Sequence, residues 1–192
     1  MPDTATTIPG LTGVEHVSTS VPDIDAARDF FVEVLGARVV GEQRFAGGRD
    51  GVDMAVSFNA HPDASARLVT LDLHGVHTEL FEYAAPDLRT EMPRNCDVGG
   101  HHLGFRVDDV AAAAEFLAKV PGVRVLGEPT YGRTDRGIHR GWVYFLTPWG
   151  LQMEIAEEHP IAGATATDTA ADAALDTAAD AALDTAPERT TR

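Results

Sequence analysis

The sequence contains one unit twice, and this internal repeat constrains the fold more than any other feature. His16 aligns with His102 at an offset of 102 − 16 = 86 residues. At the same offset, GARVVGE (36–42) aligns with GVRVLGE (122–128). Self-similarity at a fixed offset indicates two copies of one supersecondary unit, which bury their apolar faces in a folded whole.

The end of each copy repeats at a shorter offset. Glu79 aligns with Glu154 at an offset of 154 − 79 = 75 residues. The first copy therefore carries 86 − 75 = 11 extra residues, which fall within 46–66. This stretch contains Gly47-Gly48, Asp50-Gly51 and His61-Pro62, so we interpret it as a loop around one short apolar strand, 52–58.

Each copy has the pattern β-α-β-β-β. Alternating residues predict strands, and an apolar helical period between an aspartate and a glycine predicts a helix. The predicted order in the first copy is strand 14–20, helix 24–35, strand 37–45 and hairpin strands 68–73 and 76–83. The second copy has strand 102–107, helix 110–120, strand 123–131 and hairpin strands 142–147 and 151–156. We expect an α+β fold of two βαβββ modules, whose antiparallel sheets curl around a shared cavity.

The ends of the chain have a different character from the repeats. We expect a flexible N-terminus over 1–10, one domain over 11–157 (module one 11–88, module two 99–157) and a tail over 158–192. Within the tail DTAADAAL occurs twice in succession, at 168–175 and 176–183. This acidic, low-complexity sequence lacks large apolar side chains, which predicts disorder.

Composition excludes several classes of partner. The net charge is −15 and Lys119 is the only lysine, so the basic face of a nucleic-acid-binding protein is absent, and an anionic membrane surface is equally disfavoured. The chain has one cysteine, Cys96, and no apolar run of about 18 residues. These features predict a cytoplasmic protein that acts on a small molecule.

Strand parity brings four side chains to one face. Successive side chains point to opposite faces of a strand. In the first strand of each copy the apolar residues alternate with His16 or His102, and in the last strand they alternate with Glu79 or Glu154. A lone strand histidine or glutamate is usually structural or solvated, but matched His and Glu pairs in a repeat are not expected by chance. Imidazole and carboxylate ligands predict one divalent metal ion: Zn, Mn, Co, Ni or Fe.

Four strings resemble a known family: HVSTSVPDIDAARDFFVEVLG, TELFEY, HHLGFRVDDV and FLTPWGLQMEIAE. They are similar to the vicinal oxygen chelate superfamily, which includes glyoxalase I, methylmalonyl-CoA epimerase, extradiol dioxygenases and bleomycin- or fosfomycin-resistance proteins. The resemblance covers about residues 11–157. It implies a glyoxalase-like fold in which paired βαβββ modules surround a metal. The implied ligands are His16, Glu79, His102 and Glu154.

The ligand set favours an epimerase. Extradiol dioxygenases use two histidines and one carboxylate, whereas four ligands resemble the glyoxalase and epimerase branch. The resemblance implies proton abstraction beside a metal-polarised carbonyl, with Glu154 and Glu79 as candidate catalytic bases. A CoA thioester suits an acidic chain poorly, so our preferred substrate is a neutral cyclitol ketone, 2-epi-5-epi-valiolone, from bacterial specialised metabolism.

Six further residues are candidates for substrate contact. Arg106 has the parity of His102, and a salt bridge to a neighbouring acid is an equal alternative for it. Asp50 lies in the long loop of the first copy. The others are Arg67, His77, Tyr131 and His139.

Four other functions stay open. The resemblance also allows a methylmalonyl-CoA epimerase, a glyoxalase I-type lyase, a non-haem Fe(II) extradiol-type dioxygenase or a drug-sequestering resistance protein. Many members of the family form dimers, so a homodimer is a further expectation.

Overall fold

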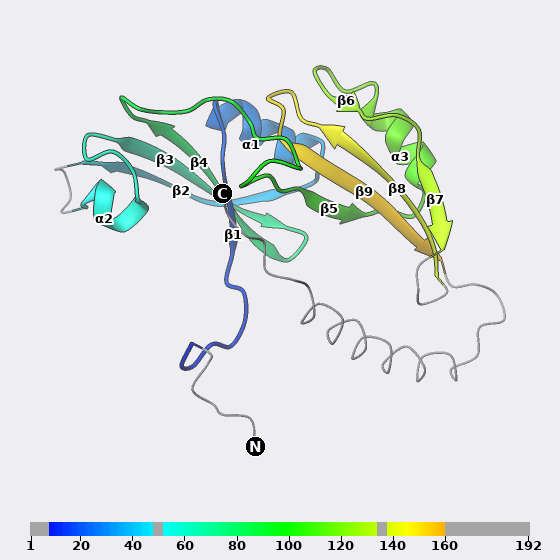
Figure 1. The fold of residues 1–192 in the computed structure, drawn as a ribbon, viewed down its shortest axis with the longest axis horizontal. Coiled ribbons are helices and arrows are strands. Elements are labelled where there is room, and N and C mark those ends of the chain that lie inside the picture. Colours follow the sequence, from blue (N-terminus) through cyan, green and yellow to red (C-terminus); the bar gives the residue numbers. More distant parts are fainter. Residues whose placement is uncertain (1–7, 48–51, 134–137, 160–192) are drawn as a thin grey trace, which may run out of the picture. The chain divides into compact units, whose positions relative to one another are not determined.

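The computed structural model describes residues 8–47, 52–133 and 138–159. The chain divides into two compact units, Met1–Glu91 and Met92–Arg192. Each unit has a mixed β-sheet with a helix against it (Figure 1), which confirms the predicted α+β class. The proposed Asp50 contact and nearly all of the predicted tail lie outside the described residues. None of the helices in the described part of the chain is long and apolar enough to cross a membrane.

Unit 1 is a four-stranded sheet in the order β1-β4-β3-β2. Its elements are β1 (Val17–Ser20), α1 (Ile24–Glu33), β2 (Arg38–Ala46), α2 (Met54–Phe58), β3 (Ser65–Leu73) and β4 (Val76–Ala84). The sheet is antiparallel except at the β1–β4 edge, where the two strands are parallel. Helix α1 begins where the sequence predicts, because the Asp23 side chain accepts hydrogen bonds from the N–H groups of Asp25 and Ala26.

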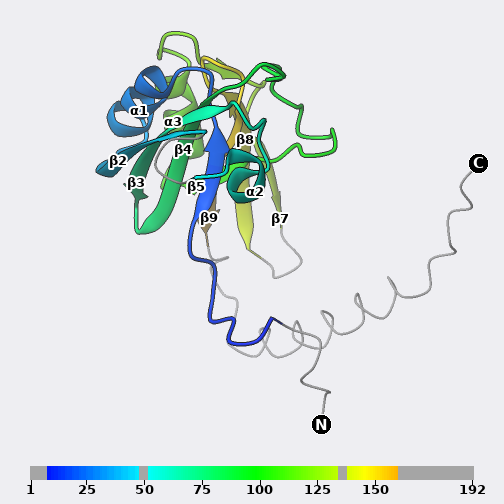
Figure 2. The same cartoon turned by 90° about the vertical axis from the view of Figure 1, so that its left-hand side faces the viewer.

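The predicted strand 52–58 is wrong, since this segment contains the short helix α2. Asp53 was not recognised from the sequence as the N-cap of this helix. The Asp53 side chain accepts hydrogen bonds from the N–H groups of Ala55 and Val56, and Asn59 ends the helix in the left-handed conformation. Met54 is buried and belongs to an apolar cluster with Leu68 and Phe81. Leu68 and Phe81 face each other across β3 and β4, on the face of the sheet opposite to Arg67 and Glu82. Figure 2 shows α2 apart from α1.

Unit 2 has the sheet order β5-β9-β8-β6, with β7 also paired to β8. Its elements are β5 (Leu103–Arg106), α3 (Val110–Leu117), β6 (Arg124–Val125), β7 (Thr130–Arg133), β8 (His139–Leu146) and β9 (Gln152–His159). Asp109 is the N-cap of α3. The predicted strand 123–131 is divided into β6 and β7, because Gly127 between them takes a φ of +88°. Strand β9 continues through His159, two residues into the predicted tail.

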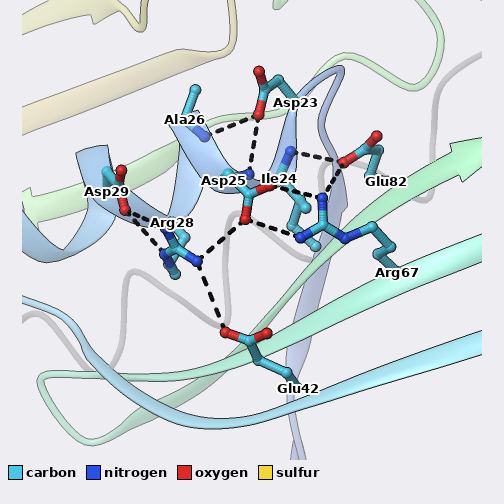
Figure 3. A network of polar contacts seen from close by, with 9 residues as sticks. All are labelled: Asp23, Ile24, Asp25, Ala26, Arg28, Asp29, Glu42, Arg67 and Glu82. Atoms are coloured by element: carbon cyan, nitrogen blue, oxygen red, sulfur yellow. Dashed lines mark hydrogen bonds and ion pairs between the residues drawn. The ribbon is translucent and has the colours of Figure 1, made fainter.

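A polar network joins α1 to the helix-covered face of the unit 1 sheet (Figure 3). Arg67 of β3 donates two hydrogen bonds to the Asp25 carboxylate, at 2.8 and 2.9 Å, and lies 3.4 Å from Glu82 of β4. Glu82 in turn accepts a hydrogen bond from the N–H of Ile24, at 3.0 Å. The bonds from Arg67 lower the pKa of Asp25. The network therefore fixes the start of α1 to the sheet.

Candidate active site and metal ligands

In unit 1, the start of β1 and the centre of β4 bring a histidine and a glutamate together. Ser18 lies directly beside Glu79 in the parallel pair, and His16 precedes Ser18 by two residues, just before β1 begins. The Nε2 atom of His16 lies 3.5 Å from an oxygen of Glu79. His77, two residues before Glu79, places its Nε2 atom 4.0 Å from the other oxygen.

Unit 2 repeats this arrangement. Gly104 lies directly beside Glu154 in the β5–β9 pair, and His102 precedes Gly104 by two residues. The Nε2 atom of His102 lies 3.1 Å from Oε2 of Glu154. Glu154 is buried, with 6% of its surface exposed. The register of the repeat is therefore the same in both units.

The second ring nitrogen of each histidine has its own partner. Nδ1 of His16 contacts the Glu15 carboxylate, which also lies 3.1 Å from Nδ1 of His77. The hydrogen bond between Glu15 and His16 raises the pKa of His16 and lowers that of Glu15. Nδ1 of His102 lies 3.0 Å from the side-chain oxygen of Asn95. Such contacts are typical of metal-binding histidines, because an acceptor on one nitrogen orients the ring and leaves the other for the metal.

The distances within each pair suit two ligands of one cation. Two atoms that each lie about 2.1 Å from a metal, at about 90–109° to each other, are separated by roughly 3.0–3.4 Å. The His102–Glu154 distance of 3.1 Å falls in this range, and the His16–Glu79 distance of 3.5 Å is close to it. Within the described ranges no three His, Cys, Asp or Glu side chains are grouped to hold a metal ion. Each unit thus brings together one His–Glu pair of candidate ligands, not a complete set.

The Glu154 face of unit 2 forms a hollow of about 580 Å³. Arg140, Trp142 and Tyr144 alternate along β8 on this face, and Tyr144 lies directly opposite Glu154. Arg140 donates a hydrogen bond to Oε1 of Glu154 at 2.8 Å, and its guanidinium lies 5.9 Å from the centre of the Trp142 ring. The remaining lining residues are His102, Gly132 and Arg133. The hollow combines aromatic faces with two arginines, which suits a small oxygen-rich ligand.

The two units differ on this face. In unit 1, β3 is the strand next to Glu79, and it carries Ala66, Leu68 and Thr70 on the same face. Ala66 and Leu68 belong to the apolar cluster with Met54 of α2. The repeat therefore preserves the His–Glu pair in both units, whereas the polar hollow with Arg140 belongs to unit 2.

The structure places the predicted substrate contacts differently. His77 lies beside the His16–Glu79 pair, and Arg106 shares the face of Glu154 and is exposed. Arg67 points to the helix-covered face of its sheet, away from Glu79. Tyr131 and His139 pair with Gly141 and Arg133, which places both side chains on the face opposite to Glu154.

Sequence reasoning missed Glu15, Asn95 and Arg140. Glu15 has the opposite strand parity to His16, but β1 begins only at Val17, so alternation does not apply before it. Arg140 was missed because the predicted hairpin strand began at 142, whereas β8 begins at His139. Asn95 lies in a loop, where no periodic signal exists.

Comparison with known proteins agrees with the fold. Residues 13–155 match the model of the Glyoxalase/Bleomycin resistance protein/Dioxygenase superfamily, and the chain belongs to this superfamily. The resemblance to vicinal oxygen chelate proteins is thereby confirmed. A glyoxalase family protein from Bacillus cereus shares the fold, with a TM-score of 0.61 at 21% identity over 81% of this chain and 99% of that one.

Two curated relatives are epimerases. A 2-epi-5-epi-valiolone epimerase from Actinomyces sp is 47% identical over 149 residues, which cover 77% of this chain and 80% of the relative. An ethylmalonyl-CoA/methylmalonyl-CoA epimerase from Cereibacter sphaeroides is 28% identical over 137 residues, covering 70% and 87%. These relatives support an isomerase of the epimerase type.

Proposed function

We propose that the protein is a metal-dependent epimerase of a small cyclitol ketone, with 2-epi-5-epi-valiolone as the substrate. The observation that carries the proposal is the matched pairing of His16 with Glu79 and of His102 with Glu154, at distances that suit shared metal coordination. The 47% identical relative of that name supports the choice of substrate.

The proposed cofactor is one divalent ion (Zn, Mn, Co, Ni or Fe) held by His16, Glu79, His102 and Glu154. The two pairs belong to different units, so their joint binding of one ion is inferred from the repeat and from the geometry of each pair. When bound, the metal would act as a Lewis acid that polarises the substrate carbonyl and stabilises negative charge on its oxygen.

The two carboxylates have different surroundings, which assigns them different roles. Arg140 and His102 each hold one oxygen of Glu154, whereas Glu79 contacts no arginine or lysine within the described part of the chain. Glu79 is therefore the freer carboxylate, and we assign proton removal to it. Glu79 takes the proton from the carbon next to the carbonyl, and the C–H electron pair forms the enolate double bond. A proton derived from solvent is then added to the opposite face of that carbon, and the enolate double bond supplies the electron pair of the new C–H bond, which completes the epimerisation.

Arg140, Trp142 and Tyr144 are the proposed substrate contacts. Aromatic rings pack against the C–H face of a cyclitol, and the arginine of the hollow donates hydrogen bonds to its hydroxyl groups. Arg106 is retained as a contact on the same face, and His77 as a neighbour of Glu79.

Solvent isotope exchange tests the proposed reaction. Incubation of the metal-loaded protein with 2-epi-5-epi-valiolone in D₂O is expected to place deuterium on the epimerised carbon, detected by NMR, without oxygen uptake. Removal of the metal with EDTA is expected to stop exchange, and re-addition to restore it. Turnover of methylmalonyl-CoA in place of the cyclitol would change the substrate assignment. Oxygen consumption with a catechol, or tight bleomycin binding without turnover, would contradict the proposal.

A homodimer remains part of the proposal. Light scattering coupled to size-exclusion chromatography gives the mass of the particle directly, against the 20.5 kDa of one chain.

A further inference from the structure

A compact loop over residues 94–100 lies just before β5. The guanidinium of Arg94 forms two hydrogen bonds with the Asp97 carboxylate, at 3.0 and 2.8 Å. The backbone closes the loop, since Asp97 N–H donates to the Arg94 carbonyl at 2.9 Å and Gly100 N–H donates to the Asp97 carbonyl at 2.8 Å. The ion pair with Arg94 lowers the pKa of Asp97 to about 2, so the pair stays charged at neutral pH.

The loop requires glycine at position 100. A Cβ atom there would lie 2.1 Å from the Arg94 carbonyl oxygen and 2.8 Å from that of Asp97. Both neighbours are backbone atoms of the same closed loop, so they cannot move aside without opening it. The ion pair, the backbone bonds and Gly100 together fix the path of the chain between Arg94 and Gly100.

This fixed path presents the Asn95 amide to His102. The Asn95 oxygen lies 3.0 Å from Nδ1 of His102. An amide oxygen can only accept, so this contact favours the tautomer that carries its hydrogen on Nδ1. In the neutral ring, Nε2 then bears a lone pair. Nε2 lies 3.1 Å from Oε2 of Glu154, and with its lone pair free the two atoms are spaced to bind one cation together.

We propose that Asn95 is a positioning residue that sets the tautomer and the ring orientation of His102 for metal binding. The inference rests on the proposed metal site. The partner of the Nδ1 atom differs between the two units: in unit 1, Nδ1 of His16 contacts the carboxylate of Glu15 instead of an amide. Asn95 touches neither substrate nor metal, and acts through the imidazole alone.

A metal titration tests the role of Asn95. Metal-free protein is titrated with Co²⁺, followed by visible absorption. Asn95→Ala is expected to weaken Co²⁺ binding by about 10–100-fold, the usual effect of losing the partner of a ligating histidine. Asn95→Asp keeps an acceptor oxygen and is expected to restore binding. Cys96→Ala changes an exposed neighbour in the same loop and serves as the matched control, with binding unchanged.

The outcomes separate the two proposals. Wild-type affinity in Asn95→Ala would overturn the role of Asn95 and leave the metal site standing. Absence of Co²⁺ binding by the wild-type protein would overturn both. Nitrogen-15 NMR of the histidine side chains in the metal-free wild-type protein gives an independent test, with the His102 signals assigned by their loss in His102→Ala. Hydrogen on Nδ1 of neutral His102 is expected, and hydrogen on Nε2 would overturn the inference.

Discussion

Replacement of His102 by alanine is expected to lower kcat/KM by at least about 10²–10³-fold, the usual effect of removing one strong electrostatic contribution to a transition state. The reason is the loss of one of the proposed metal ligands, which leaves Arg140 as the close cationic partner of Glu154 among the described residues. The measurement is epimerisation of 2-epi-5-epi-valiolone by each variant after incubation with the same metal.

His101 provides the control for this variant. It is adjacent in sequence, it is exposed, and its Nδ1 contacts the nearby Gly99 carbonyl, at 3.3 Å. His101→Ala is therefore expected to keep the activity of the wild-type protein. Equal losses in the two variants would indicate damage to the chain before β5, and would argue against a specific role for His102.

Replacement of Glu79 by glutamine is expected to reduce kcat by about 10²–10⁴-fold, the contribution of a positioned proton-transfer group. The amide retains an oxygen that can bind a metal but cannot accept the proton from substrate. The variant should therefore keep most of its Co²⁺ binding while it loses deuterium exchange. The two measurements together distinguish the role of Glu79 as a metal ligand from its role as the proton acceptor.

Glu82 is the matched control for Glu79. It lies on the same strand with the opposite parity, and it accepts a hydrogen bond from the start of α1 (Figure 3). Glu82→Gln is expected to affect stability and to leave kcat unchanged. Full activity in Glu79→Gln would assign the base to another carboxylate.

The sequence predicts the strands and helices wherever the repeat and the periodicity agree. Helix α1 and its Asp23 cap, and both hairpins that carry Glu79 and Glu154, follow from local pattern. The prediction was wrong at 52–58, because a five-residue helix is too short to establish a period and an apolar run of that length suits a strand equally well. The break between β6 and β7 lies at Gly127 and Pro129, a turn signal that the prediction of one strand over 123–131 overlooked.

The His–Glu pairs could be predicted because they depend on strand parity and on the repeat. Their partners could not. Asn95 contacts His102 from a loop. Arg140 lies four residues before Tyr144, the direct cross-strand neighbour of Glu154, and reaches Glu154 through its long side chain. These contacts are set by loop closure and side-chain length, which alternation does not describe. Arg67 was predicted to contact substrate, but its side chain lies on the face of the sheet that α1 covers, where it forms ion pairs with Asp25 and Glu82.

The most direct test is the metal content of the purified protein, measured by mass spectrometry of the ion after loading and gel filtration. The wild-type protein is expected to hold one divalent ion per chain. His16→Ala and His102→Ala, one change in each unit, should both lose it. Two ions per chain, or full retention in either variant while the protein stays folded, would mean that the two His–Glu pairs do not share a cation.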